Sequence, residues 1–199
     1  MFSFRIQRIR LVRSILALSA WRITEYDSTG QVVHGEELKA LCEVCHEGVT
    51  LVLDEFYSQY IYDLDDGATV TGARYVKDVN KDSIVLIDGL TKNYRYPGFR
   101  VAWVVGPESL IRAIGQSGGA LDGGAAHLLQ VAALTVFKEP ERSQEQLALQ
   151  NHFRMKRDYV LSRLAKMGLE VTNVPNSTFY VRPLSLFPVV ADCLDHRFG

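Results

Sequence analysis

The sequence has no hydrophobic run of the length that a bilayer-spanning helix needs, and no excess of either charge. Its 22 Lys and Arg residues against 23 Asp and Glu residues leave a net charge of −1, so we expect neither a membrane nor a nucleic acid as a partner. Three cysteines, an odd number, exclude a complete disulfide framework and indicate a reducing compartment. Hydrophobic residues make up 47% of the 199 positions, which is enough to fill a core and excludes global disorder.

Acidic residues are missing from the first 24 positions, where arginines are interleaved with apolar side chains. Arg-rich, Ser-containing ends without acidic residues are typical of organellar transit peptides. The same pattern also fits an ordinary first strand of a globular domain. We therefore expect a cytoplasmic protein and keep an organellar location as the alternative.

Short apolar runs alternate with amphipathic segments along the rest of the chain. We expect strands at Ile15–Ser19, Val49–Leu53, Ser83–Ile87, Val101–Val105, Leu169–Thr172 and Phe179–Val181. We expect helices at Gly35–Glu47, Pro107–Gly115, His127–Phe137 and Glu141–Met167, with a glycine-rich loop over 118–124. This alternation predicts an α/β fold with a mostly parallel sheet flanked by helices. We expect an N-terminal segment over 1–24, a partial large domain over 25–144, and a long helix with the start of a small α+β domain over 145–199.

Two segments carry cofactor chemistry at expected strand ends. In the first segment, Asp54 directly follows the expected strand Val49–Leu53, and Tyr57 follows three residues later. The second segment places Lys92 shortly after an apolar run and Arg100 eight residues further on, beyond a Pro-Gly turn. Lysine forms a Schiff base with a carbonyl, and arginine binds phosphate through paired hydrogen bonds. These side chains can therefore converge on one small anionic ligand.

The segments Val49-Thr-Leu-Val-Leu-Asp54-Glu-Phe-Tyr57 and Gly89-Leu-Thr-Lys92, followed by Arg100, resemble the signature of class I/II aminotransferases, pyridoxal phosphate enzymes of fold type I. The resemblance implies that Lys92 is catalytic and forms the aldimine with pyridoxal 5'-phosphate. It implies that Asp54 pairs with the pyridine nitrogen, Tyr57 with the phenolic oxygen and Arg100 with the phosphate. It also implies a homodimer that transfers an amino group between an amino acid and a 2-oxo acid.

Two positions near the implied site depart from the family pattern. Asp27 and Ser28 stand where the family has Asn-Pro, and an ionised Asp27 cannot donate a hydrogen bond to the cofactor phenolate. Gly89 stands where the family often has a phosphate-binding serine, which leaves Thr91 as the cofactor-binding hydroxyl beside the lysine.

The family's N-terminal half and its substrate-binding C-terminal arginine have no counterpart that we recognise, since Arg182 and Arg197 lie in no matching motif. We therefore expect a truncated member of the family. One alternative is a catalytically inactive remnant, or an interaction partner of a full-length homologue. Another is a synthase, decarboxylase or lyase, because the same residues serve those reactions in this fold.

Other motifs predict structure rather than chemistry. Cys42-Glu-Val-Cys45-His46 has the spacing of c-type haem attachment, but both cysteines fall on the apolar stripe of an expected helix. Cys193 and His196 supply only one of the two ligand pairs of a zinc site. The acidic turn Asp63–Gly67 lacks the closing Glu of a calcium loop. We therefore expect no metal site.

Overall fold

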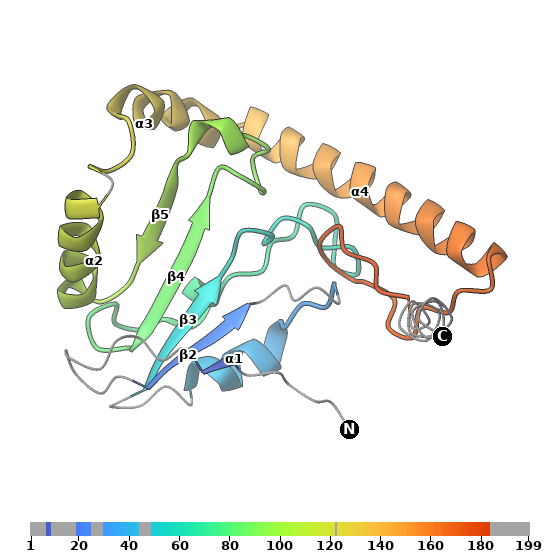
Figure 1. Cartoon of the computed structure of the whole chain (residues 1–199), viewed down its shortest axis with the longest axis horizontal. Coiled ribbons are helices and arrows are strands. Elements are labelled where there is room, and N and C mark those ends of the chain that lie inside the picture. The colour runs from blue at the N-terminus through green and yellow to red at the C-terminus, as the bar shows by residue number, and fades with distance from the viewer. Residues whose placement is uncertain (1–6, 9–18, 25–29, 44–48, 122, 184–199) are drawn as a thin grey trace, which may run out of the picture.

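A computed structural model describes residues 7–8, 19–24, 30–43, 49–121 and 123–183 (Figure 1). The strands are β1 (Gln7–Arg8), β2 (Ser19–Thr24), β3 (Val49–Asp54), β4 (Ile84–Gly89) and β5 (Ala102–Val105). The α-helices are α1 (Gly35–Glu43), α2 (Glu108–Leu121), α3 (His127–Ala133) and α4 (Glu141–Lys166). The short 3-10 helices are η1 (Gly72–Tyr75), η2 (Pro97–Phe99) and η3 (Leu134–Phe137).

The five strands form one sheet in the order β1-β2-β3-β4-β5. The central strands β2, β3 and β4 are parallel, whereas β1 and β5 pair antiparallel at the two edges. The expected α/β fold is therefore confirmed, with a parallel centre and antiparallel edges. The register aligns Asp54 of β3 with Ile87 of β4, so the segments that leave these two strands start at the same edge of the sheet.

The main core lies where α1 covers the sheet. On α1, Leu38 and Cys42 are one helical turn apart and both are buried. They pack with buried side chains from β3, β4 and the connecting segments, namely Val32, Leu51, Leu53, Ile61, Val70, Ile84 and Leu86. Cys42 is thus a core residue, as its place on the apolar stripe predicts, whereas Cys45 and His46 lie outside the described residues.

The long helix α4 docks through polar side chains on the loop that follows β3. Gln150 donates a hydrogen bond to the carbonyl of Ala68 and accepts one from the N–H of Gly67. Arg154 forms an ion pair with Asp66, so the acidic turn 63–67 serves as a docking point for the helix. The helix ends in a Schellman motif at Gly168, which has a φ of 71° and donates to the carbonyl of Ala165.

Several expectations about local structure need correction. The segments Leu169–Thr172 and Phe179–Val181 are not strands: the chain there forms bends that fold back onto the loop after β3. Gly118 and Gly119 belong to α2 instead of a loop, since this helix continues to Leu121. The strand expected at Ile15–Ser19 falls largely outside the described residues, and the observed strand is β2. Among the described helices, none is long and apolar enough to cross a membrane.

Candidate active site

The candidate site begins where β3 and β4 end. The alternation of β3 buries Leu53 and Glu55 on one face and leaves Asp54 partly exposed on the other. A turn after β3 then brings Tyr57 to the same end of the sheet. Beyond β4, a loop carries Lys92. This loop is anchored by Leu90, which is fully buried. The N–H of Leu90 donates to the carbonyl of Val101, and its carbonyl accepts from the N–H of Tyr96.

The structure brings Lys92 together with Tyr57, as the sequence predicts. The Lys92 ammonium lies 5.9 Å from the centre of the Tyr57 ring and 5.3 Å from the centre of the Phe179 ring. These two rings contact each other edge to face, with centroids 5.3 Å apart. The amine is thus held against two aromatic faces, which attract a cation through their quadrupoles. Phe179 comes from the segment after α4, far from Lys92 in the sequence.

The Tyr57 hydroxyl has a close neighbour from the same distant segment. It lies 3.1 Å from the hydroxyl of Tyr180, within hydrogen-bond distance. Burial raises the pKa of Tyr57 above its ordinary value of 10.0, and the hydrogen bond to Tyr180 and the negative charge of nearby Asp54 raise this pKa further. Tyr57 is therefore a protonated donor over the physiological pH range.

Arg100 and Thr91 lie in the same loop as Lys92. Arg100 is exposed, whereas Thr91 and Tyr57 are partly buried. Arg100 has a left-handed φ of 52°, and its guanidinium donates to the carbonyl of Pro97 at 2.9 Å within its own turn. Its side chain is exposed, so the guanidinium faces solvent at this end of the loop. Thr91 is partly buried between Leu90 and Lys92.

A buried amide connects the two site segments. Asn93 is 3% exposed and follows Lys92 directly. Its side-chain NH2 group donates to the carbonyl of Glu55 at 2.9 Å, to Ser58 Oγ at 3.0 Å and to Asp88 Oδ1 at 2.9 Å. Its Oδ1 accepts the main-chain N–H of Gln59 at 3.1 Å.

Two carboxyl groups lie close to Asn93, the partly buried Asp88 and the buried Glu55. Burial raises the pKa of Asp88 to about 7, although hydrogen bonds from Gly89 and Asn93 favour its ionised form. Burial also raises the pKa of Glu55, whose carboxylate accepts hydrogen bonds from Gly72 N–H at 2.7 Å and Thr71 Oγ1 at 2.8 Å. Glu55 thus points away from the Asp54 side of the strand and fixes the turn at η1.

The glycine at position 89 has a packing reason. A Cβ atom there would lie 2.8 Å from the Phe56 ring and 2.9 Å from the Cα of Ala102. Because β5 pairs directly with this position, a serine has no room without moving the strand. Phe56 and β5 therefore approach position 89 too closely for the serine that the family often has there.

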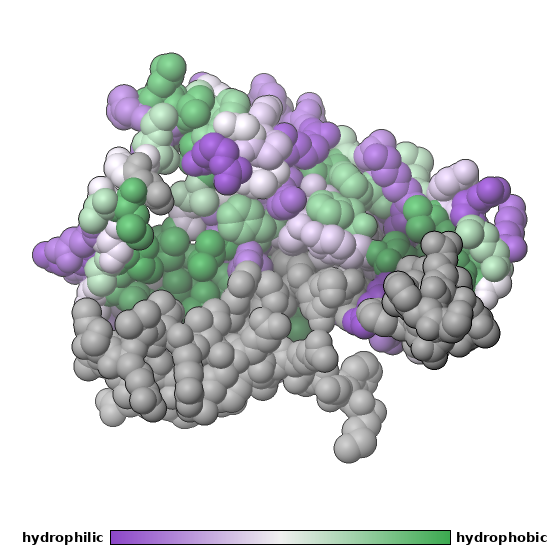
Figure 2. Space-filling model, in the orientation of Figure 1, coloured by the Kyte–Doolittle hydropathy of each residue, from purple (hydrophilic) through white to green (hydrophobic). Residues whose placement is uncertain are grey.

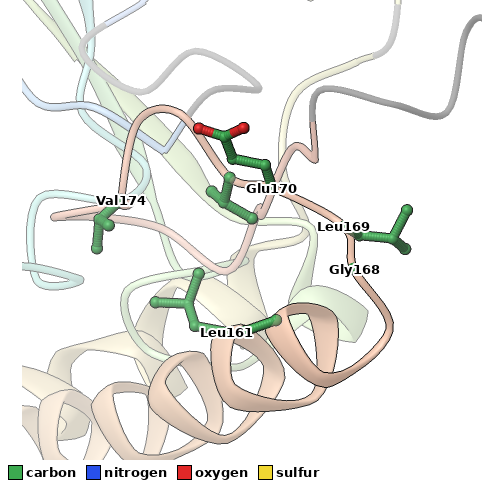
Figure 3. Close-up of a pocket in the computed structure, with 7 residues that line it drawn as sticks. Leu161, Gly168, Leu169, Glu170 and Val174 are labelled. Atoms are coloured by element: carbon green, nitrogen blue, oxygen red, sulfur yellow. The ribbon is translucent and has the colours of Figure 1, made fainter.

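Among the pockets of the described residues, one of about 300 Å³ borders the candidate site, because Phe179 and Tyr180 line it. Another of about 360 Å³ is formed by the end of α4 and the segment after it, and Leu161, Leu169 and Val174 line it with Glu170 (Figure 3). It contains none of the residues around Lys92. Within the described ranges, no three His, Cys, Asp or Glu side chains are grouped closely enough to hold a metal ion.

Sequence reasoning predicts Asp54, Tyr57 and Lys92 as site residues but does not predict the side chains from distant segments that contact Tyr57 and Lys92. The sequence predicts Phe179 and Tyr180 in a strand, and the run Val174–Tyr180 resembles the entry to the family's small domain, but neither signal predicts contact with Tyr57 and Lys92. Asn93 carries no local signal except its place next to the lysine. Asp27, Ser28, Arg197, Cys193 and His196 lie outside the described residues, and Arg182 is exposed.

Comparison with known proteins places this geometry in one family. The family model described as aminotransferase class I and II matches residues 26–186. The chain is 29% identical over 157 residues to a probable aspartate/prephenate aminotransferase of Aquifex aeolicus (strain VF5), covering 78% of this chain and 39% of that protein. It is 28% identical over 156 residues to an aspartate aminotransferase of Geobacillus stearothermophilus, covering 78% of this chain and 38% of that protein.

Solved structures show the same relationship. A Methanococcus jannaschii protein, described as similar in its active site to kynurenine aminotransferases, matches with a TM-score of 0.68 and 27% identity, over 82% of this chain and 42% of that one. A Thermus thermophilus aspartate aminotransferase variant shares the fold, with a TM-score of 0.70 over 81% of this chain and 41% of that one. The chain thus spans well under half the length of these relatives. Since the family model covers most of its residues, the chain belongs to the class I and II aminotransferase family.

Proposed function

We propose that the chain binds pyridoxal 5'-phosphate through Lys92 and functions as an aminotransferase-like protein. The observation that carries the proposal is the position of the Lys92 amine against the Tyr57 ring, three residues from a carboxylate at a strand end. The donor set fits this cofactor. Lys92 supplies an amine for its aldehyde, Asp54 a carboxylate for its ring nitrogen and Tyr57 a hydroxyl for its phenolic oxygen.

The phosphate end of the cofactor is assigned to the loop between β4 and β5. We assign its charge to Arg100, whose exposed guanidinium donates to the carbonyl of Pro97 in its own turn, and a hydroxyl contact to Thr91. Positive φ at a non-glycine residue costs free energy and is concentrated at ligand-binding sites, which favours a ligand role for Arg100.

The chain's own residues account for the steps around the cofactor. When bound, pyridoxal phosphate supplies an electron sink for the amino acid's α-carbon. Asp54 stabilises a proton on the ring nitrogen, and protonated Tyr57 donates a hydrogen bond to the phenolic oxygen. With the cofactor bound, Lys92 Nζ would take the proton from the α-carbon as general base and would deliver it to the other end of the 1,3-proton shift as general acid. The aromatic faces of Tyr57 and Phe179 limit the access of water to that amine.

The substrates follow from this chemistry as an amino acid donor and a 2-oxo acid acceptor. Aspartate is the first donor to test, because two of the relatives are named as aspartate or aspartate/prephenate aminotransferases. Product analysis separates the reactions: transfer forms a new amino acid from the 2-oxo acid, whereas a decarboxylase releases carbon dioxide from the donor.

The direct test is borohydride reduction after incubation with pyridoxal phosphate, followed by peptide mapping. We expect one label per chain, on Lys92, and its loss in Lys92→Ala. Lys156→Ala is the matched control, because Lys156 also places its amine over an aromatic ring, 5.2 Å from the Phe153 centroid. Labelling that is equal on both lysines, or unchanged in Lys92→Ala, contradicts the proposal.

A second candidate function is that of a binding partner for a full-length homologue. The large apolar side chains Leu121, Leu128 and Leu134 are 82%, 77% and 64% exposed. Apolar surface gathers over α2 and α3 and the neighbouring sheet edge (Figure 2). Exposed apolar clusters of this kind mark interaction surfaces. Light scattering of the chain alone and mixed with a full-length aminotransferase distinguishes a homodimer from a mixed assembly.

The division of the chain stays a prediction as well. We propose that the segment 1–24, the partial large domain 25–144 and the part 145–199 are separate units. Limited proteolysis tests this boundary, which falls in the first turn of α4: cleavage in or just before that turn supports it, and cleavage only beyond the first turn of α4 contradicts it.

A further inference from the structure

The buried Asn93 side chain forms hydrogen bonds through both its NH2 group and its Oδ1. The two N–H bonds of its NH2 group serve three acceptors, in the main chain of Glu55, the hydroxyl of Ser58 and the carboxylate of Asp88. The main-chain N–H of Gln59 meets its Oδ1, which fixes the orientation of the amide. The side chain is therefore completely engaged while it is nearly inaccessible to solvent.

The partners of Asn93 lie on the two segments that form the site. Glu55, Ser58 and Gln59 flank Tyr57 in the turn after β3, whereas Asp88 is on β4, shortly before the Lys92 loop. A second bond joins the same segments, because the Tyr60 hydroxyl donates to the carbonyl of Lys92 at 3.0 Å. The Lys92 loop is thus attached to the Tyr57 segment at two consecutive residues, through the main-chain carbonyl of Lys92 and the side chain of Asn93.

A fixed main chain limits where the lysine side chain can reach. Lysine has four rotatable side-chain bonds and loses conformational entropy when it is immobilised. An amine that reacts efficiently must be held close to its target before the reaction, and a displacement of about 1 Å costs on the order of 100-fold in rate. The attachment of the Lys92 loop to the Tyr57 segment supplies this restraint.

We propose that Asn93 is a positioning residue that holds the Lys92 amine against Tyr57, with Asp88 as the anchor of its amide. The inference rests on the proposed function, in which Lys92 binds the cofactor, and deepens it. Asp88 suits the anchoring role because its Oδ1 accepts from both the Gly89 N–H at 2.6 Å and Asn93 at 2.9 Å. A hydrogen bond to a buried carboxyl group is stronger than one to a neutral acceptor when the group is ionised.

The test compares Asn93→Ala with Gln150→Ala in the full chain. Gln150 of α4 is the matched control, because it is another buried amide. Its two main-chain partners, Gly67 and Ala68, lie on the loop after β3. The first measurement needs no cofactor. It is the rate at which an amine reagent labels Lys92 relative to Lys156 across pH, read by peptide mass spectrometry. The second is the rate of borohydride-trapped labelling of Lys92 with pyridoxal phosphate.

We expect Asn93→Ala to change the pH profile of Lys92 labelling and to slow the trapped labelling about 10-fold or more. Gln150→Ala lowers stability but leaves both properties of Lys92 as in the wild type. An Asn93→Ala chain that is folded and has the wild-type Lys92 profile overturns the proposal. If wild-type Lys92 takes no cofactor label, the proposed function fails, whereas reagent labelling still decides the role of Asn93.

A pair of substitutions keeps the test decisive if Asn93→Ala does not fold. Asn93→Asp removes the donor and places a second carboxyl group beside Asp88. Adding Asp88→Asn returns a donor and an acceptor to the two positions with their direction reversed. We expect the double variant to recover part of the Lys92 labelling profile that Asn93→Asp loses, because the bond between positions 88 and 93 returns whereas the donation to the Glu55 carbonyl does not. No recovery in a folded double variant contradicts the proposed anchor.

Discussion

The hydroxyl groups of Tyr57 and Tyr180 lie 3.1 Å apart, although 123 residues separate them in the sequence. Their rings meet edge to face with centroids 6.0 Å apart. The contact joins the turn after β3, which carries the candidate site, to the segment after α4. A displacement of the segment after α4 therefore changes the surroundings of the Tyr57 hydroxyl, the group that we assign to the phenolic oxygen of the cofactor.

Replacing Tyr180 by phenylalanine lowers the pKa of Tyr57. Burial is the larger cause of the raised pKa and remains, so the value moves toward the ordinary 10.0 without reaching it. Alkaline titration followed by ultraviolet absorbance measures the change. Tyr159→Phe is the control, because Tyr159 is 65% exposed on α4. Equal titration curves for both variants contradict the assigned hydrogen bond.

The buried carboxyl of Asp88 makes stability fall as pH rises from about 4 to 7. Its ordinary pKa of 3.8 describes the unfolded chain, and its folded value is about 7. Below both values the group is protonated in each state, so its contribution to folding is complete. As pH rises, the unfolded state loses its proton first, and roughly 4 kcal/mol of stability is lost by the time the folded pKa is passed.

The measurement is the free energy of unfolding in urea at several pH values. We expect Asp88→Asn to flatten the decline, whereas Asp65→Asn, at an exposed carboxyl group, leaves it unchanged. The neighbouring buried carboxyl Glu55 has its pKa raised too, so a smaller decline in the same direction persists in Asp88→Asn. A decline of the same size in both variants contradicts the assignment to Asp88.

Much of the central sheet follows from local pattern. The apolar run before Asp54, interrupted only by Thr50, predicts β3, although the structure buries one face of this strand more completely than the other. The antiparallel direction of β5 does not follow from its own residues, since it depends on the tight loop that Leu90 anchors. The segment 169–183 has apolar residues like a strand, yet its main-chain groups bond to Gly30 and Tyr60 instead of to a sheet neighbour.

The residues of the candidate site also include some that local pattern predicts and some that it does not. Asp54, Tyr57 and Lys92 are recognisable because their spacing is local and their chemistry is specific. Asn93 and Tyr180 act through partners 35 and 123 residues away, and no local pattern encodes such a contact. Non-local contacts depend on how the loops pack, which a single sequence does not display.

A serine at position 89 restores the family's residue but disturbs the sheet. Its Cβ meets the Phe56 ring and the Cα of Ala102, so we expect a loss of about 1 to 3 kcal/mol. Affinity for pyridoxal phosphate, measured by titration of the protein's absorbance, does not improve. Gly98→Ser is the control, because a Cβ there meets nothing within 4 Å. Tighter cofactor binding with unchanged stability in Gly89→Ser contradicts the packing explanation.

Gly30 holds the C-terminal segment in place by its lack of a side chain. It has a φ of 73°, and a Cβ would lie 2.6 Å from the Cβ of Pro175 and 2.8 Å from the carbonyl oxygen of Tyr180. Gly30→Ala therefore combines an unfavourable left-handed backbone with a collision. Gly35 is the matched control, since its φ is 60° and a Cβ there meets nothing within 4 Å.

We expect Gly35→Ala to cost about 1 kcal/mol, from the backbone alone, and Gly30→Ala to cost about 1 to 3 kcal/mol more. Because the collision displaces the carbonyl of Tyr180, Gly30→Ala also weakens the hydrogen bond between Tyr180 and Tyr57. The pKa of Tyr57 then falls in Gly30→Ala, as it does in Tyr180→Phe, and stays at its wild-type value in Gly35→Ala. Urea unfolding and alkaline titration of the three variants measure both effects. A loss of stability in Gly30→Ala without a change in the Tyr57 titration shows that the two segments are not coupled through Tyr180.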